Sequence, residues 1–215
     1  MRDIIHGLNQ ANELLEEMSF VEAIYTVNKV SQEFLVRPIG IFQLCDYVGL
    51  DVCQFIMKVM KPRLAEDNLH SELLDKMVEM GVKGGQYADG SQKDGFLKYE
   101  KGRPGAVFSI KENKYIPFAQ FQSKIDEKLG GFPSTHVAWK KMLGIKDRHP
   151  LLSNYFNDLK TMDTLGADLA RKYMKKSKEI GELLVNKGIA ITPKDVNSVL
   201  EMGFFHVYGP INDYV

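Results

Sequence analysis

Apolar residues recur at helical spacing through most of this chain, and this pattern limits the folds that the chain can adopt. In residues 2–17, apolar side chains lie three or four positions apart, with polar side chains between them. The same pattern recurs in residues 19–34, 52–60, 71–80 and 163–187. Strand and helix patterns do not alternate along the chain, so a doubly wound parallel sheet is not expected. The sequence therefore predicts a mainly helical protein.

Capping residues predict where several of these helices begin and end. Ser19 and Ser71 each precede a helical stretch, where a serine side chain can accept a hydrogen bond from a free N–H group. Thr192 followed by Pro193 predicts the start of a last helix, because proline fits the first helical position. Gly81 follows the stretch that begins at Ser71 and predicts its end.

Residues 81–113 differ in character, because they hold seven glycines with lysine and aspartate between them. This composition predicts a loop region, with short extended pieces around residues 96–99 and 107–110. We therefore expect an all-α fold of two tandem helical domains joined by a Gly-rich loop linker. The expected bounds are 1–100 for the first helical domain, 101–133 for the linker and 134–215 for the second, related domain.

A segment near the start of the chain recurs near its end. The matched residues, each 169 positions apart, are Glu13-Leu14-Leu15, Val27-Asn28, Val30 and Gly40 in the first copy and Glu182-Leu183-Leu184, Val196-Asn197, Val199 and Gly209 in the second. A single match of leucine or valine arises easily by chance. Seven matches at one offset, in the same helical context, favour a duplication of a helix pair.

The charge balance excludes two classes of function. The chain has 28 Lys and Arg residues and 28 Asp and Glu residues, so its formal net charge is zero. A dedicated nucleic-acid binder needs a surplus of cations to neutralise phosphates, and a polybasic membrane-surface protein needs the same surplus. No run of 18 apolar residues is present, so no membrane-spanning segment is expected.

The common catalytic and metal-binding motifs are absent from the sequence. No Gly-x-Gly-x-x-Gly pattern follows a predicted strand, and no glycine pair is followed by the lysine of a phosphate-binding loop. The five histidines form no His-Glu-x-x-His pattern, and there is no Cys-x-x-Cys. We therefore expect no catalytic, cofactor-binding or metal-binding residue in this chain. His6, near the apolar face of the first helix, is interpreted as a packed or surface residue.

The two cysteines, Cys45 and Cys53, lie eight positions apart on a stretch that reads as helical. At the helical rise per residue this spacing separates them by about 12 Å, which is too far for a disulfide while the helix holds. The sequence thus predicts two reduced core residues and, by default, a reducing cytoplasmic setting.

Five cations lie in and just after the glycine-rich region, at Lys83, Lys93, Lys98, Lys101 and Arg103. Two interpretations stay open for them. They can be the solvated charges of an ordinary loop, or they can contact an anion such as the phosphate of a nucleotide-bearing substrate.

Three segments resemble one known family in the same order along the chain. Residues 38–51 (Pro-Ile-Gly-Ile-Phe-Gln-Leu-Cys-Asp-Tyr-Val-Gly-Leu-Asp), 74–81 and 94–99 are similar to segments of the C-terminal domain of 3-hydroxyacyl-CoA dehydrogenases. Residues 185–211 resemble the same domain more weakly, and residues 101–160 have no counterpart.

The resemblance implies the helical C-terminal domain of that family, here in tandem. Such enzymes oxidise a 3-hydroxyacyl-CoA with NAD, and their separate Rossmann domain binds NAD and supplies the catalytic histidine and its glutamate partner. The helical domain closes the cleft and mediates dimerisation. In the family this domain opens with an Asn-Arg pair whose asparagine lines the active site, whereas this chain has Met1-Arg2. Gly40-Ile41 also departs from the family's Gly-Pro.

We therefore expect a domain of a longer enzyme, or a gene that encodes only this part. The expected role is the substrate-side and dimerisation portion of an NAD-dependent oxidoreductase of fatty-acid β-oxidation or related acyl-CoA metabolism. This chain is then inactive alone, with NAD held by the parent enzyme, acyl-CoA bound through that enzyme, and a homodimer as its assembly. Two other readings stay open: an acyl-CoA-binding module without chemistry, and a structural helical assembly unit.

Overall fold

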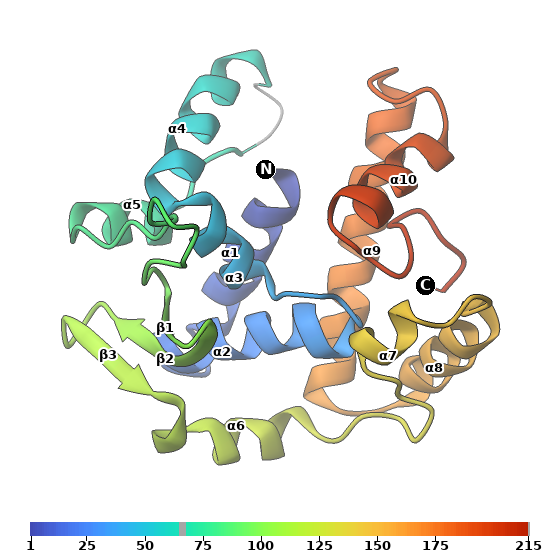
Figure 1. Cartoon of the computed structure of the whole chain (residues 1–215), viewed down its shortest axis with the longest axis horizontal. Helices are drawn as coiled ribbons and strands as arrows, with labels where there is room; N and C mark the ends of the chain where they lie inside the picture. Colours follow the sequence, from blue (N-terminus) through green and yellow to red (C-terminus); the bar gives the residue numbers. More distant parts are fainter. Residues whose placement is uncertain (65–67, 215) are drawn as a thin grey trace. The chain divides into compact units, whose positions relative to one another are not determined.

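The computed structural model describes residues 1–64 and 68–214, so residue 215 of the predicted second domain lies outside the described residues. The fold is mainly helical, as predicted, with one small antiparallel sheet (Figure 1). The chain divides into two compact units: unit 1 holds residues 1–28 and 41–125, and unit 2 holds residues 29–40 and 126–215. None of the helices in the described ranges is long and apolar enough to cross a membrane.

Unit 1 is built mainly from helices that pack on one another through apolar faces. Its helices are α1 (Arg2–Leu14), α2 (Phe20–Lys29), α3 (Ile41–Val48), α4 (Leu50–Met60) and α5 (Glu72–Glu79), and a 3-10 turn at Lys61–Arg63 follows α4. Helix α1 packs against α3 and α5, and α4 packs against the same two helices. Ile4, Leu8 and Ala11 form the buried face of α1, as the helical spacing predicted.

The close packing of α1 on α3 requires a glycine. A Cβ atom added to Gly7 would lie 2.8 Å from both Cγ atoms of Ile41, which is closer than real Cβ contacts come. The absence of a side chain at Gly7 therefore lets the first residue of α3 reach the backbone of α1.

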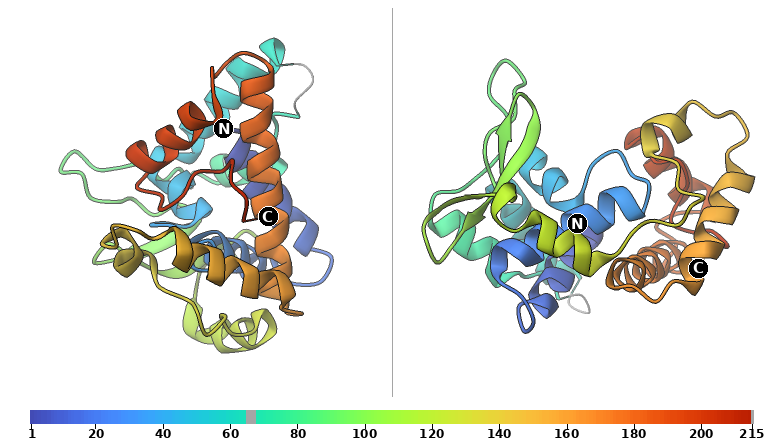
Figure 2. Two further views of the ribbon diagram at one scale, coloured as in Figure 1. Left: turned by 90° about the vertical axis from the view of Figure 1, so that its right-hand side faces the viewer. Right: turned by 90° about the horizontal axis from the view of Figure 1, so that it is seen from below.

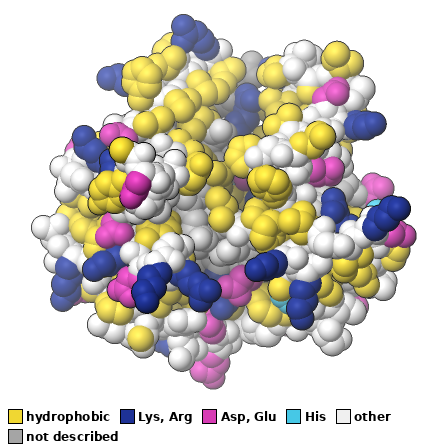
Figure 3. Space-filling model, viewed as in Figure 1, with side chains coloured by type: hydrophobic (Ala, Val, Ile, Leu, Met, Phe, Trp, Pro, Cys, Tyr) yellow, Lys and Arg dark blue, Asp and Glu magenta, His cyan; other side chains and the backbone are white. Residues whose placement is uncertain are grey.

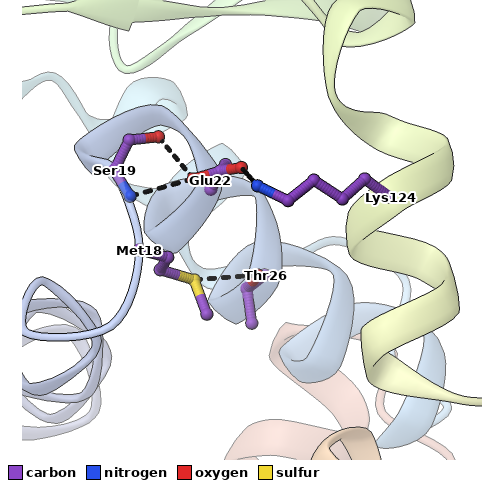
Figure 4. Close-up of polar contacts among 5 residues, drawn as sticks. All are labelled: Met18, Ser19, Glu22, Thr26 and Lys124. Atoms are coloured by element: carbon purple, nitrogen blue, oxygen red, sulfur yellow. Dashed lines mark hydrogen bonds and ion pairs between the residues drawn. The ribbon is translucent and has the colours of Figure 1, made fainter.

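The start of α2 is held by the polar group shown in Figure 4. Glu22 Oε2 accepts hydrogen bonds from the Ser19 N–H (2.9 Å) and the Ser19 hydroxyl (2.8 Å). Lys124 Nζ lies 2.9 Å from Glu22 Oε1. Burial acts to raise the pKa of Glu22, but the hydrogen bonds from Lys124 and Ser19 outweigh it and lower that pKa to about 2. The predicted helix start at Ser19 is confirmed.

A three-stranded antiparallel sheet follows the glycine-rich region of unit 1. Its strands β1 (Leu97–Glu100), β2 (Arg103–Ser109) and β3 (Lys114–Pro117) pair in sequence order. Leu97 pairs with Val107, and Val107 pairs with Ile116, so buried residues share one face. The turn between β1 and β2 is made by Lys101 and Gly102, both with positive φ.

Helix α6 (Gln122–Leu129) carries the chain into unit 2, whose described part contains helices and loops but no strand. Unit 2 contains a π-helical turn (Val30–Phe34), α7 (Trp139–Leu143), α8 (His149–Thr161), α9 (Leu165–Asn186) and α10 (Pro193–Gly203). Figure 2 shows α9 as the longest of these helices, and α10 packs beside it. At the start of α10, Thr192 and Asp195 cap each other's backbone N–H groups, which confirms the predicted start.

Residues 101–133, which we expected to form a loop linker, contain strands β2 and β3 and helix α6. The expected extended pieces around residues 96–99 and 107–110 overlap β1 and β2. The division into related domains at residues 1–100 and 134–215 stays a prediction. The compact units have different bounds, because residues 29–40 belong to unit 2.

One hydrogen bond recurs in both units at the predicted 169-residue offset. In unit 1, Asn28 Oδ1 accepts from the backbone N–H of Phe42 (3.1 Å). In unit 2, Asn197 Oδ1 accepts from the backbone N–H of Ile211 (3.0 Å). Both pairs are separated by 14 residues, and the second pair lies 169 positions after the first. This shared asparagine contact supports a duplicated helix pair.

Candidate functional site

Two of the three segments that carry the family resemblance meet at a buried carboxylate in unit 1. Asp46 lies on α3 and has no exposed surface. Its Oδ1 accepts from the backbone N–H of Phe96 (2.6 Å), and its Oδ2 accepts from the N–H of Leu97 (2.9 Å) and the hydroxyl of Tyr99 (2.9 Å). Asp46 therefore ties the third resembling segment, residues 94–99, directly to the first, residues 38–51.

The backbone of Asp46 holds the glycine-rich loop as its side chain holds β1. The Asp46 carbonyl oxygen accepts from the N–H of Gly85 (2.7 Å) and from Nε2 of Gln92 (2.9 Å). Gly84 has a positive φ, and a Cβ there would lie 2.8 Å from that same oxygen. A Cβ at Gly95 would overlap the Asp46 carboxylate. These two glycines are thus needed where the loop backbone approaches α3.

The electrostatics of Asp46 reflect a balance between burial and hydrogen bonding. Burial raises the pKa of Asp46 to about 8, while the N–H groups of Leu97 and Phe96 and the hydroxyl of Tyr99 act to lower it. Burial and the neighbouring Asp46 carboxylate raise the pKa of Tyr99 well above its usual range. Tyr99 therefore stays a hydrogen-bond donor at every physiological pH.

The cluster around Asp46 positions other parts of unit 1 and is not placed to act as a catalytic acid or base. A general acid or base must come within hydrogen-bond reach of the substrate proton. Asp46 is fully buried, and its three side-chain hydrogen bonds all go to residues 96–99 of its own unit. We assign it the role of fixing the loop and β1 on α3.

The two cysteines lie beside this cluster, and the single helix that we expected to carry both is interrupted. We expected Cys45 and Cys53 about 12 Å apart on one helix. The helix breaks at Gly49, whose φ is 99°, so Cys45 lies on α3 and Cys53 lies on α4. Both are buried and free, as predicted.

The five cations of the glycine-rich region lie in unit 1 along the loop and the sheet. Lys83 Nζ lies 3.8 Å from Asp51 Oδ2, and Lys93 Nζ lies 5.3 Å from the centre of the Tyr87 ring. Lys98 lies on β1, Lys101 on the turn, and Arg103 begins β2, and all three are exposed. The contact with a substrate anion stays a prediction.

His6 is half-buried on α1, and its interpretation as a packed or surface residue stays a prediction. In the part of the chain that the structure describes, no group of three or more His, Cys, Asp or Glu residues could hold a metal ion. The sequence analysis missed Asp46 as an organising residue. The available signal was a charged side chain inside the otherwise apolar run of residues 41–48.

Unit 1 thus defines a class of domain: a small bundle of helices whose central helix anchors a glycine-rich loop and a short sheet through one buried aspartate. Comparison with family models identifies this class. Residues 2–99 match the model described as "3-hydroxyacyl-CoA dehydrogenase, C-terminal domain".

A curated relative supports the same assignment. Over 94 residues the chain is 35% identical to a probable 3-hydroxybutyryl-CoA dehydrogenase of Deinococcus radiodurans. The alignment covers 43% of this chain and 33% of the relative, so the chain spans about a third of the length of that relative. Comparison with solved structures gave no match.

Proposed function

We propose that this chain supplies the helical, substrate-side portion of an NAD-dependent 3-hydroxyacyl-CoA dehydrogenase. The observation that carries the proposal is the agreement between the family match over residues 2–99 and the cluster around Asp46. The cluster lies within the match and reaches its end, because Asp46 ties α3 to residues up to Tyr99. The segment thus carries the contacts that hold the glycine-rich loop and β1 on α3, and in this proposal they support a substrate site.

The hydride transfer belongs, in this proposal, to a nucleotide-binding part. Dinucleotide-binding folds use parallel strands with helices between them. The three strands of the described residues are antiparallel and follow one another directly. The chain alone is therefore expected to be inactive, and acyl-CoA to be bound jointly with the NAD-binding part. A cytoplasmic place in fatty-acid or related acyl-CoA metabolism and a homodimeric assembly complete the proposal.

A chimeric enzyme tests this function directly. Residues 2–99 replace the matched segment of the Deinococcus radiodurans relative, and NADH formation from 3-hydroxybutyryl-CoA is followed. We expect turnover by the chimera and none by the present chain alone. A matched chimera with Asp46→Ala is expected to lose most of this activity, because the loop and β1 lose their anchor. A folded chimera without activity, or turnover by the chain alone, would contradict the proposal.

A second candidate, a structural assembly unit, is favoured by an exposed apolar face on α4. Val52, Phe55 and Val59 lie on one side of this helix and are 45%, 66% and 41% exposed. Figure 3 shows hydrophobic side chains gathered over this helix. Sedimentation of the wild-type chain and of Phe55→Glu distinguishes the candidates. Self-association that Phe55→Glu abolishes, together with an inactive chimera, would favour assembly over enzyme chemistry.

A further inference from the structure

The glycine-rich loop contains a small hairpin over residues 84–94 that holds an aromatic ring in solvent. Its two arms are joined by backbone hydrogen bonds. The N–H of Lys93 donates to the carbonyl oxygen of Gly85 (2.9 Å), and the N–H of Tyr87 donates to that of Ser91 (2.8 Å). The Tyr87 residue is nevertheless 58% exposed. The hairpin therefore fixes the backbone of Tyr87 and leaves its side chain open to a ligand.

The base of this hairpin is anchored in the core of unit 1. Gln92 Nε2 donates to the carbonyl oxygens of Asp46 (2.9 Å) and Gly85 (3.1 Å). The N–H of Gly85 donates to the same Asp46 oxygen at 2.7 Å. Because Asp46 is fully buried, the hairpin is tied to the interior on both arms. A ligand that binds here pays little for ordering the loop.

A cation and an open backbone position lie beside the exposed ring. Lys93 Nζ lies 5.3 Å from the centre of the Tyr87 ring, so the ammonium group covers one part of the ring in a cation–π contact. Gly85 faces Lys93 across the hairpin. Among the described residues beyond its chain neighbours, nothing lies within 4 Å of a Cβ atom added to Gly85. Bare backbone therefore borders the cation, and a flat ligand can approach it closely.

This combination suits a nucleotide. Aromatic side chains stack on any base, because every base has a π face, and a lysine binds phosphate as a point charge. Since Nζ lies close to the ring, the phosphate within its reach is one carried by the sugar of the stacked base. Coenzyme A carries phosphate at both the 3′ and the 5′ position of its adenosine, and NAD carries it at the 5′ position alone. The two are the possible sources of the same chemistry.

We propose that Tyr87 and Lys93 bind the adenosine 3′,5′-bisphosphate end of an acyl-CoA. The adenine stacks on the Tyr87 ring, and a phosphate contacts the Lys93 ammonium group beside Gly85. This inference rests on the proposed function, because that function makes an acyl-CoA the substrate. The contact is one of binding only, so no bond forms or breaks in it. It assigns one cation of the glycine-rich region to the phosphate contact that the sequence left open.

The test titrates the full chain with adenosine 3′,5′-bisphosphate and follows the ligand by NMR. Adenosine alone and inorganic phosphate alone are titrated in parallel. We expect the bisphosphate to bind at least about fivefold more tightly than either, because stacking and the phosphate contact act together. Absence of binding, or a bisphosphate that binds no better than inorganic phosphate, would overturn the proposal.

Competition distinguishes the two sources of adenosine. Coenzyme A and NAD are each used to displace the bound bisphosphate. Coenzyme A is expected to displace it at lower concentration than NAD, since only coenzyme A has the 3′-phosphate beside the stacked base. Equal displacement by the two compounds would contradict the assignment to an acyl-CoA.

Variants of the two residues test their separate roles. Tyr87→Ala is expected to weaken bisphosphate binding by about 5- to 150-fold, whereas Tyr87→Phe keeps the ring and the affinity. Lys93→Gln is expected to weaken binding and to reduce its salt dependence. Lys114→Gln removes another exposed lysine, on β3, and is the matched control. Equal losses for Lys93→Gln and Lys114→Gln, with circular dichroism showing both folded, would mean that only overall charge matters.

These measurements are independent of the chimera that tests the proposed function, because they need no turnover. An active chimera together with a chain that binds no bisphosphate would contradict this inference and leave the function standing. An inactive, folded chimera would remove the function and the acyl-CoA assignment with it, even where the bisphosphate binds.

Discussion

At the residue scale, Asp46 shows how a single side chain can hold distant parts of a chain together. Its carboxylate receives three donors from residues 50 to 53 positions later in the sequence. The two backbone donors, of Phe96 and Leu97, are removed from water, so each loses its hydration and needs this acceptor. The cluster therefore stabilises the fold chiefly by avoiding unsatisfied polar groups.

The first prediction concerns this residue. Asp46→Ala leaves the N–H groups of Phe96 and Leu97 without their acceptor, and we expect the free energy of unfolding to fall by about 3 kcal/mol. Tyr99→Phe removes only one of the three hydrogen bonds and is expected to cost about 1 kcal/mol. Urea unfolding of both variants measures the difference. A loss for Asp46→Ala no larger than that for Tyr99→Phe would show that the backbone donors find other partners.

The sequence indicates that Asp46 is buried, but it does not indicate which groups bind its carboxyl group. An aspartate within the mostly apolar residues 41–48 signals a buried carboxyl group that needs hydrogen-bond partners. The partners cannot be found by spacing, because the chain between α3 and β1 includes two helices and an irregular loop. Likewise, the break between α3 and α4 depends on the positive φ of Gly49, which helical periodicity does not reveal.

At the scale of elements, helix starts were predicted well and the sheet was predicted poorly. Ser71 and Thr192 each accept a hydrogen bond from a backbone N–H of the helix that follows, because capping depends on residues within one turn. Helix α2 begins after Ser19 as predicted, but there the hydroxyl and N–H of Ser19 donate to Glu22. The turn from β1 to β2 places Lys101 at a φ of 51°, where asparagine or glycine is usual. Pro104 and Gly105 make β2 harder to predict from the sequence, since both residue types are rare within strands.

The second prediction is a pH dependence at the start of α2. The pKa of Glu22 is lowered to about 2 in the folded chain from the ordinary value of 4.5. The ionised carboxylate therefore contributes stability above pH 4.5, and this contribution is lost as the pH falls towards 2. Glu22→Gln is expected to be less stable than the wild type by about 1 kcal/mol at pH 7.

The measurement is chemical denaturation of the wild type and Glu22→Gln from pH 7 to pH 2. The difference between the two should shrink below pH 4.5, which isolates Glu22 from the other titrating carboxylates. Lys124→Gln is a useful companion, because it removes the ion pair but leaves the Ser19 hydrogen bonds. A difference that does not change with pH would refute the assigned role of the charge.

The third prediction concerns the packing of α1 on α3. Gly7→Ala improves helix propensity by about 1 kcal/mol, but its new methyl group meets Ile41 at 2.8 Å. We expect a net destabilisation of about 1–3 kcal/mol, because overpacking forces the helices apart. Gly203→Ala is the control, since this glycine in α10 has no atom within 4 Å of the added Cβ. A thermal melt in which both variants gain stability would rule out tight packing at Gly7.

At the scale of the whole molecule, the two units share a local design. Asn28 and Asn197 are matched positions of the predicted repeat, and each accepts a hydrogen bond from a backbone N–H group 14 residues later. Asn197 also donates from Nδ2 to the carbonyl oxygen of Ile211 at 2.8 Å. The repeat was visible in the sequence as seven matches, but the reason for the asparagine became clear only from its hydrogen bonds.

The fourth prediction compares the two asparagines. Asn28→Ala and Asn197→Ala are each expected to lower the free energy of unfolding by about 1–3 kcal/mol, since each leaves a backbone N–H without its acceptor. Hydrogen exchange, resolved along the chain, should show the loss of protection concentrated in unit 1 for the first variant and in unit 2 for the second. Equal loss of protection throughout the chain for both variants would speak against separate local roles.

The assignment of residues 29–40 to unit 2 has a practical consequence for anyone who dissects this protein. Tyr155 donates to the carbonyl oxygen of Phe34 (2.8 Å), and Tyr208 donates to that of Leu35 (2.9 Å). Truncation of the chain anywhere between residues 41 and 125 therefore yields a C-terminal fragment that lacks residues 29–40, whose carbonyl oxygens its tyrosines bind. Such fragments should be insoluble when expressed singly and should recover when both pieces are made together.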